Sequence, residues 1–335
     1  MRYPEMLDKK YLQRKILRTE FFVFIAIIIL SILIQLRSGQ FFSNNNLVDL
    51  VRAVIIPAMF SIAAMIVLVS GGTDVSAPSI ASLAMYLVSK WMLRYEGNVI
   101  VLFLIGAGIG IILGCLNGYL IARFQFPTLI VTLGTASLYT GLLQGVFAAH
   151  EHPVPAPMHA LGKAKLFSVE NAVSGLKSNM PLTIFLLIAL VILVWFILQK
   201  TMLGRGIYAI GGDVISAQRA GFNVFQIQMF IYIFVGMIAG ITGVARASMM
   251  MNCQPTNLNG MEMTAIASCV LGGTSVQGGA GSITGTILGV LLITIISNSL
   301  LLLGISTFWQ KIFTGLIILI GTGVSAYRMK QRQGH

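Results

Sequence analysis

Two glycine-rich turns resemble each other in sequence and carry two polar side chains, Asp74 and Gln277, that are candidates for a gate. Residues 67–80 read VLVSGGTDVSAPSI, and residues 270–283 read VLGGTSVQGGAGSI, so both contain the triplet Gly-Gly-Thr. Unwound glycine-rich backbone at matching places in two halves of a chain is typical of membrane transporters built from repeats. Chance similarity of two turns is the alternative. The residues predicted to form a gate are Gly71, Gly72, Asp74, Gly272, Gly273 and Gln277.

No constellation of residues predicts covalent catalysis. The chain lacks a G-x-x-x-x-G-K-[ST] phosphate loop, so we expect it not to hydrolyse ATP by itself. The triplet His150-Glu151-His152 differs from the H-E-x-x-H zinc arrangement and is interpreted as part of a solvated loop. A membrane-embedded enzyme would need an acid, base, nucleophile or metal ligands clustered at one depth, and none is visible. We therefore expect no metal and no cofactor on this chain.

The composition predicts a membrane protein. Of the 335 residues, 56% are apolar and only 10% are charged, and the mean hydropathy is +0.88. Soluble domains contain roughly 25% charged residues, so this chain lacks the polar surface to stay in water. Three cysteines are an odd number and do not suggest a disulfide framework. Because helices satisfy their backbone hydrogen bonds without water, we predict an all-α polytopic membrane fold.

About ten segments are predicted to cross the membrane, since a crossing helix needs about 20 mainly apolar residues. Two weaker segments, 77–93 and 263–273, are interpreted as spans or as broken or re-entrant helices. The eight clear segments lie at about 21–36, 47–70, 98–121, 127–148, 181–199, 227–248, 282–303 and 306–327.

The distribution of basic residues predicts that both termini lie in the cytoplasm. With ten crossings, most lysines and arginines fall on the inner side, as the positive-inside rule requires. This divides the chain into a basic leader (1–20), a transmembrane domain (21–327) and a tail (328–335). The longest external loop is then 149–180, and the longest internal loop is 200–226. The net charge of +12 thus reflects topology and attraction to anionic membrane lipid, rather than nucleic-acid binding.

Two apolar segments carry glycine at every fourth residue, which places the glycines on one helix face. Glycine lets two helices approach closely, so we predict tight helix packing at these stripes. A surface on which helices slide is the alternative. The stripes are Gly106, Gly110, Gly114 and Gly118, and Gly281, Gly285 and Gly289.

Four motifs carry a family resemblance. They lie at 70–79 (SGGTDVSAPS), 127–134 (PTLIVTLG), 209–222 (beginning AIGGD) and 262–282. Together they resemble the permease subunits of ribose-type sugar ABC importers, and the likeness extends over about 47–327. The chain departs from the family pattern at three positions, Pro78, Asp213 and Thr264.

The resemblance implies a type II ABC importer-like fold and a set of partners. Two permease chains would form a central pathway in the cytoplasmic membrane of a bacterium, the second being an identical copy or a paralogue. Two cytoplasmic ATPases, which hold ATP and magnesium, would drive transport. An external sugar-binding protein would deliver the solute. The chain itself would be the membrane-spanning subunit for a monosaccharide or a similar small neutral solute.

The internal loop 200–226 matches the coupling segment of the resembled family. We interpret it as a short amphipathic helix rimmed by glycines, which docks in a groove of the ATPase; an ordinary amphipathic connector is the alternative. The Gly211-Gly212 pair is expected to permit a tight turn before this helix. The residues predicted to couple to the ATPase are Gly211, Gly212, Asp213, Ala217 and Gly221.

A sugar pathway needs weak, exchangeable hydrogen bonds from small polar side chains inside the spans, although some of these groups could instead serve helix packing. A carboxylate substrate would favour a basic group in the cavity, and no basic residue lies at mid-depth. A nucleoside or branched-chain amino acid permease is the second hypothesis, and a self-sufficient secondary carrier the third. The pathway candidates are Asn117, Thr132, Thr135, Ser137, Gln144, Thr264, Ser268 and Asn298.

Overall fold

The computed structural model describes most of the chain between residues 19 and 302. Most of the predicted leader, the predicted tail and most of the expected span at 306–327 lie outside the described residues. Those described are 19–95, 97–170, 175, 177–302, 309, 312, 315, 316, 319 and 323.

The described chain is mostly helical, and five of its helices are long and apolar enough to cross a membrane. They are α2 (Thr19–Ser38), α3 (Asn44–Val69), α5 (Val99–Phe124), α6 (Thr128–Gly141) continued by the π-helical η1 (Leu142–Val146), and α11 (Val224–Met250). A sixth crossing results if α8 (Ile184–Lys200) and α9 (Met202–Gly212) are one span bent by 74°. The polytopic membrane fold is therefore confirmed, but the predicted count of about ten spans is not.

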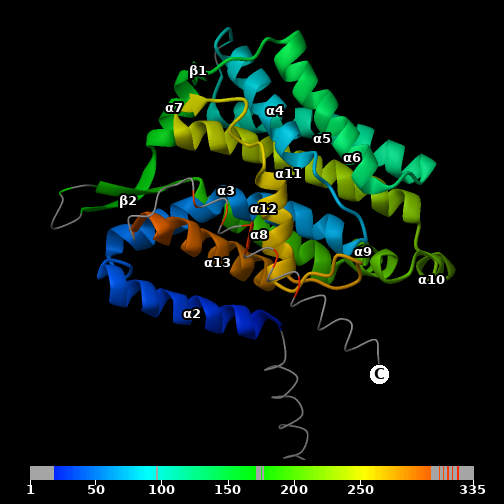
Figure 1. Cartoon of the computed structure of the whole chain (residues 1–335). Helices are drawn as coiled ribbons and strands as arrows, with labels where there is room; N and C mark the ends of the chain where they lie inside the picture. Colours follow the sequence, from blue (N-terminus) through cyan, green and yellow to red (C-terminus); the bar gives the residue numbers. More distant parts are fainter. Residues whose placement is uncertain are drawn as a thin grey trace, which may run out of the picture.

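The remaining helices are not counted among these crossings. The two weak spans expected from the sequence are α4 (Ala77–Met92) and α12 (Met261–Leu271), with 16 and 11 residues. At about 1.5 Å per residue, neither reaches across a hydrocarbon layer of roughly 30 Å. In Figure 1, α12 crosses the direction of its neighbours α3 and α13 rather than running beside them. The other helices are α7 (Ala156–Lys163), α10 (Val214–Arg219) and α13 (Ile283–Leu302).

Short strands in the connecting segments correct the expectation of a purely helical chain. Strand β1 (His152–Pro153) pairs antiparallel with β4 (Asn252–Cys253), and β2 (Lys165–Glu170) pairs with β3 (Lys177–Pro181) in a hairpin. Pairing satisfies backbone groups that no helix serves. The hairpin is attached to the start of α3, where Asn45 donates to the Val169 carbonyl at 3.0 Å and Ser178 donates to Asp49 at 2.9 Å.

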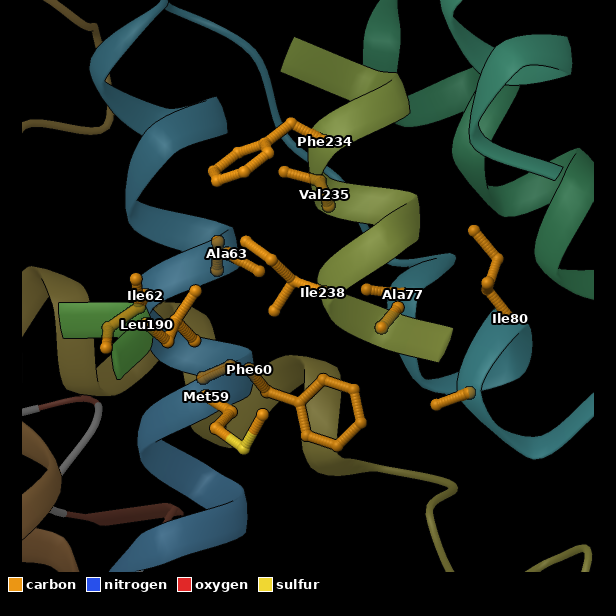
Figure 2. Packing of buried hydrophobic residues seen from close by; sticks show 14 of the residues in the cluster. Met59, Phe60, Ile62, Ala63, Ala77, Ile80, Leu190, Phe234, Val235 and Ile238 are labelled. Atoms are coloured by element: carbon orange, nitrogen blue, oxygen red, sulfur yellow. The ribbon is translucent and has the colours of Figure 1, made fainter. Parts of the chain in front are cut away.

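Helix α3 forms the centre of the hydrophobic core. All but one of the residues from Val54 to Val69 are buried, and the helix packs against α8, α11, α12 and α13. Figure 2 shows Ile238 of α11 pointing toward Ala63 of α3, while Leu190 of α8 lies beside Ile62. A helix that is apolar on all sides and covered by others is typical of the middle of a membrane bundle. The turn that follows α3 is thus held by a rigid support.

The predicted glycine stripe on α5 is confirmed as a close-packing face against α11. A Cβ placed on Gly110 would collide with the backbone of Gly236, and a Cβ on Gly236 or Gly240 would collide with the backbone of Gly110 or Gly106. A Cβ on Gly106 would collide with the Val244 side chain and lie 3.2 Å from the Gly240 carbonyl oxygen. These two glycines on α11 complete a symmetric contact that the α5 spacing alone did not reveal. In the second stripe, Gly285 and Gly289 of α13 meet the backbone of α12 in the same way.

The two Gly-Gly-Thr turns end their helices in the same manner. After α3, the Gly72 N–H donates to the Val67 carbonyl and Gly71 has a φ of +84°. After α12, the Thr274 N–H donates to the Cys269 carbonyl and Gly273 has a φ of +91°. Both are Schellman endings. The structure makes Gly71 equivalent to Gly273, whereas the sequence match pairs Gly71 with Gly272. The two endings do not confirm an internal repeat, because α10 ends in the same way at Gly221.

The α5–α11 contact generates a stability prediction. Replacing Gly110 by Leu forces a side chain into the Gly236 backbone and should cost more than the roughly 1–3 kcal/mol of ordinary overpacking. The matched control is Gly108→Leu on the same helix, because a Cβ at Gly108 meets nothing within 4 Å. Thermal unfolding of the purified proteins in detergent checks this. Equal melting temperatures for the two variants would contradict the assigned contact.

Candidate functional site

Three of the predicted motifs meet at one glycine-rich junction. It joins the end of α3, the end of α9 and the loop 272–282. The Gly279 N–H donates to the Val69 carbonyl at 2.8 Å, while a Cβ on Gly211 would collide with that same carbonyl. Gly278, with a φ of +95°, leaves no room for a Cβ against the Gly211 backbone. The backbones of the three segments are therefore in direct contact, and none can shift without moving the others.

The predicted gate residues surround this junction but differ in exposure. A Cβ on Gly71 would lie 3.7 Å from the Gln277 carbonyl oxygen, so the two glycine-rich turns lie next to each other. Gly272 packs against the backbone of α13, and the Gln277 side chain is exposed. A Cβ on Gly72 would lie 2.9 Å from the Tyr232 hydroxyl. The two turns that sequence similarity linked are thus neighbours in space.

Tyr208 of α9 adds a side-chain connection to the junction. Its hydroxyl donates to the Gly281 carbonyl at 2.9 Å, and its ring is half-buried. This bond connects the internal loop 200–226 to the loop that follows α12. The sequence interpretation missed Tyr208, because a single tyrosine beside the Gly-Gly pair carried no recognisable spacing signal.

The loop 200–226 differs from its expected form. It holds two helices, α9 and α10, instead of one, and Gly211 and Gly212 are the last two residues of α9. Neither has a positive φ, so the expectation that this pair shapes a tight turn was wrong. The bend occurs at Asp213, whose backbone is extended. Gly211 is needed for space against α3, whereas a Cβ on Gly212 meets nothing.

The other coupling candidates shape α10. Asp213 accepts a hydrogen bond from the Ser216 N–H at 2.6 Å and so caps the helix; these hydrogen bonds lower the pKa of its carboxyl. Ala217 is buried, and Gly221 takes a positive φ of +87° where α10 ends. The helix leaves Ile215 59% exposed, which provides an apolar surface beside the junction.

Asp74 lies in a buried hydrogen-bond network rather than on an open surface. It is 6% exposed, and its carboxylate accepts the Ser76 N–H at 2.7 Å and the Ser76 hydroxyl at 2.6 Å. The Ser76 oxygen in turn accepts the Asn117 amide at 2.8 Å. Burial raises the pKa of the Asp74 carboxyl, and the Ser76 hydrogen bonds oppose that rise. The network attaches the start of α4 to α5.

Hydroxyl groups of α6 hold the same turn from the other side. The Thr73 N–H donates to the Thr128 hydroxyl at 2.9 Å, and the Thr132 hydroxyl donates to the Thr73 carbonyl at 3.3 Å. Thr135 donates to the Thr132 carbonyl within its own helix. The pathway candidates Asn117, Thr132 and Thr135 therefore have partners within the chain, and the first two of them position the turn that carries Asp74.

Three other pathway candidates line a separate cavity. Thr264, Ser268 and Asn298 surround a space of about 260 Å³ between α3, α12 and α13. The last two candidates, Ser137 and Gln144, are exposed on α6 and η1 and line neither this cavity nor the network of Asp74. The eight candidates thus fall into three groups within one chain.

Comparison with known proteins defines the family of this arrangement. Residues 46–321 match the family described as the permease component of branched-chain amino acid transport systems. The chain belongs to this family. The ribose import permease protein of Haemophilus influenzae is 30% identical to this permease, over 91% of this chain and 92% of its own length. The ribose import permease protein of Bacillus subtilis is 32% identical over 89% of each chain.

A further relative of this permease is named for a different sugar, fructose. The fructose import permease protein of Rhizobium meliloti is 29% identical over 87% of this chain and 81% of its own length. No solved structure matches the chain. This permease is therefore a multi-pass transport component, as its apolar helices also indicate.

The Asp74 network of this permease generates a prediction with a defined pH dependence. Because the folded pKa is raised, ionisation of Asp74 lowers stability as pH rises through the interval between the unfolded and folded pKa values. Asp74→Asn keeps the oxygen acceptor and cannot ionise. Its melting temperature should therefore equal that of the wild type in acid and exceed it near neutral pH. Asp74→Ala loses both Ser76 bonds and should be less stable throughout, by about 1–3 kcal/mol.

Melting temperatures measured in detergent between about pH 4 and pH 8 check these expectations. If the melting temperatures of wild type and Asp74→Asn changed with pH in parallel, burial would not shift the pKa of this carboxyl. Wild-type stability of Asp74→Ala would show that the network does not hold the start of α4.

Proposed function

We propose that this permease is the membrane-spanning subunit of an ATP-driven importer for a monosaccharide or a similar small neutral polar solute. Its relatives named ribose and fructose import permeases match the chain nearly end to end. The observation that carries the proposal is the lining of the cavity between α3, α12 and α13. Among the described residues that line it, the polar groups are hydroxyls and an amide, and none is charged.

A second candidate function is the transport of a branched-chain amino acid, which the description of the matched family favours. An amino acid brings a carboxylate into the membrane, and such a group is best met by a basic side chain or a helix N-terminus. The described residues of the cavity lining include no basic residue. A neutral polyol therefore fits the described lining better. A nucleoside would also be neutral but is larger.

The helices α9 and α10 support the proposed docking of a cytoplasmic ATPase. Val214 and Ile215 are exposed at the start of α10, 40% and 59% respectively. Such side chains at a short helix outside the membrane bundle fit a groove on a protein partner. The junction of Gly211 with Val69 and Gly279 then carries a displacement of α9 into the bundle. In this proposal ATP and magnesium bind to the ATPase, and this side of the membrane is the cytoplasm.

The exposed face of α6 supports the proposed pairing with a second permease, either a copy or a paralogue. Ser137 and Gln144 lie on this face, and a Cβ on Gly134 or Gly141 would meet nothing within 4 Å. Polar groups exposed among apolar neighbours such as Ile130 are costly in lipid. Another chain on this face would enclose them. Ser137 and Gln144 then line a pathway between two permeases.

The opposite end of the bundle is proposed to face outward and to receive the solute-binding protein. It carries the β2–β3 hairpin, on which Phe167 is 50% exposed and Lys177 pairs with Glu170 at 3.3 Å. Lipid contacts are proposed along the exposed apolar faces of α2 and α5, where Leu36 is 79% and Ile112 is 70% exposed. Both termini lie in the cytoplasm in this orientation, in the inner membrane of a bacterium.

Reconstitution tests the function directly. The permease, its ATPase and its binding protein are placed in liposomes, and uptake of labelled D-ribose, D-fructose and L-leucine is measured. We expect ATP-dependent accumulation of a monosaccharide and no accumulation of leucine. Uptake of leucine instead would support the second candidate. Accumulation by the permease alone, without ATP, would show a secondary carrier.

The junction predicts that Tyr208 affects coupling. Tyr208→Phe removes the hydrogen bond to Gly281, worth about 0.5–1.5 kcal/mol, and leaves the ring in place. Solute transported per ATP hydrolysed should fall about threefold, while ATP hydrolysis persists. The control is Tyr119→Phe, because Tyr119 is 48% exposed and packs against Phe124 through its ring. An unchanged transport ratio in Tyr208→Phe would remove this tyrosine from the coupling route.

A further inference from the structure

The cavity between α3, α12 and α13 has the size of a site for a small solute. Its volume of about 260 Å³ lies just below the roughly 300 Å³ at which sites for drug-sized ligands begin. The cavity lies beside the first half of α3, between the middle of the helix and its start, where the β2–β3 hairpin is attached. An occupant therefore meets three helices of one permease before it reaches the glycine junction.

The walls offer hydrogen bonds on two sides. Helix α12 contributes Thr264 and Ser268, and α13 contributes Thr294, Ser297 and Asn298. Hydroxyls donate one bond and accept two, and an amide offers both kinds of group. This mixture matches the hydroxyl groups of a polyol, each of which also donates and accepts.

The third wall contains a backbone carbonyl that its own helix cannot satisfy. Pro57 lies inside α3 and has no N–H, so the carbonyl of Ala53, four residues earlier, loses its helical donor. Both residues line the cavity. Inside a membrane protein, such a freed carbonyl is satisfied by a neighbouring polar group, a water or a ligand. A solute hydroxyl in the cavity is a suitable donor.

The polar side chains are held in place but are not fully used. Asn298 donates from its amide nitrogen to Asn46 at 3.0 Å, which leaves its amide oxygen for another donor. Ser268 donates to the Thr264 carbonyl at 2.8 Å and is fully buried, so it supports the wall, whereas Thr264 and Asn298 are partly exposed. Because none of the described lining residues is charged, each bond that they make to a solute is individually weak. A site of this kind holds a solute briefly and releases it.

We propose that this cavity is a binding site for a small neutral polyhydroxylated solute during its passage through the chain. This inference rests on the proposed function and deepens it. It assigns a role to Ala53, Pro57, Thr294 and Ser297, beyond the pathway residues expected from the sequence. The solute passes through a pocket within one permease and not only between two permeases.

Filling the cavity tests the proposal. Ala53 is exposed on the cavity wall, so Ala53→Phe introduces bulk without removing a hydrogen bond. In liposomes with the ATPase and binding protein, uptake of the monosaccharide should fall about tenfold while ATP hydrolysis continues, because several weak bonds are lost together. The matched control is Val51→Phe on the same helix, since Val51 is 37% exposed and does not line the cavity.

Two isosteric variants keep the test sharp if the bulky one assembles poorly. Thr264→Val and Thr294→Val each remove one hydroxyl, and each should lower uptake about threefold. The control Thr242→Val removes a buried hydroxyl that bonds within α11, away from the cavity. Normal monosaccharide uptake by Ala53→Phe and by both threonine variants overturns the binding site and leaves the proposed function standing. Failure of the unsubstituted protein to import any monosaccharide overturns both.

Discussion

Direct contact between glycine backbones is the constraint on which the rest of this structure depends. In a membrane, apolar side chains gain little by leaving lipid, so helices associate through close packing. The contacts of α5 with α11 and of α12 with α13 both use positions where no Cβ fits. The same kind of contact joins Gly211 of the short helix α9 to the end of α3. One type of interaction thus builds the bundle and connects the segment 200–226 to it.

The second requirement is that the backbone groups of a buried turn find partners, and this places several of the polar residues. The turn after α3 would leave backbone groups unsatisfied, and Asp74, Thr128 and Thr132 supply their partners. The sequence predicted Thr132 as a pathway residue and Asp74 as a gate residue, because small polar groups inside apolar segments serve both to bind a solute and to hold a turn. The structure separates the two uses: those around Asp74 are engaged by the chain, whereas Thr264 and Asn298 face a cavity.

The sequence predicted the membrane class, the glycine faces and the family, because each depends on composition or on short spacing. The number of spans could not be predicted in the same way. Hydropathy measures apolarity and not direction, so α12, which crosses its neighbours, resembles a short span. The partners of glycines were also hidden: Gly110 shows a stripe on α5, but only the fold identifies Gly236 opposite it. Likewise, nothing in the spacing joined Tyr208 to Gly281.

The arrangement separates rigid from adaptable parts of the chain. Around Val69, backbone contacts without spare volume join α3, α9 and the loop 272–282, so a displacement at α9 cannot be absorbed locally. The cavity lies further along the same α3, where Pro57 has already interrupted the helical hydrogen bonds. A helix yields most easily where its hydrogen bonds are missing. Movement that enters at the glycine junction is therefore expected to change the shape of α3 at the cavity.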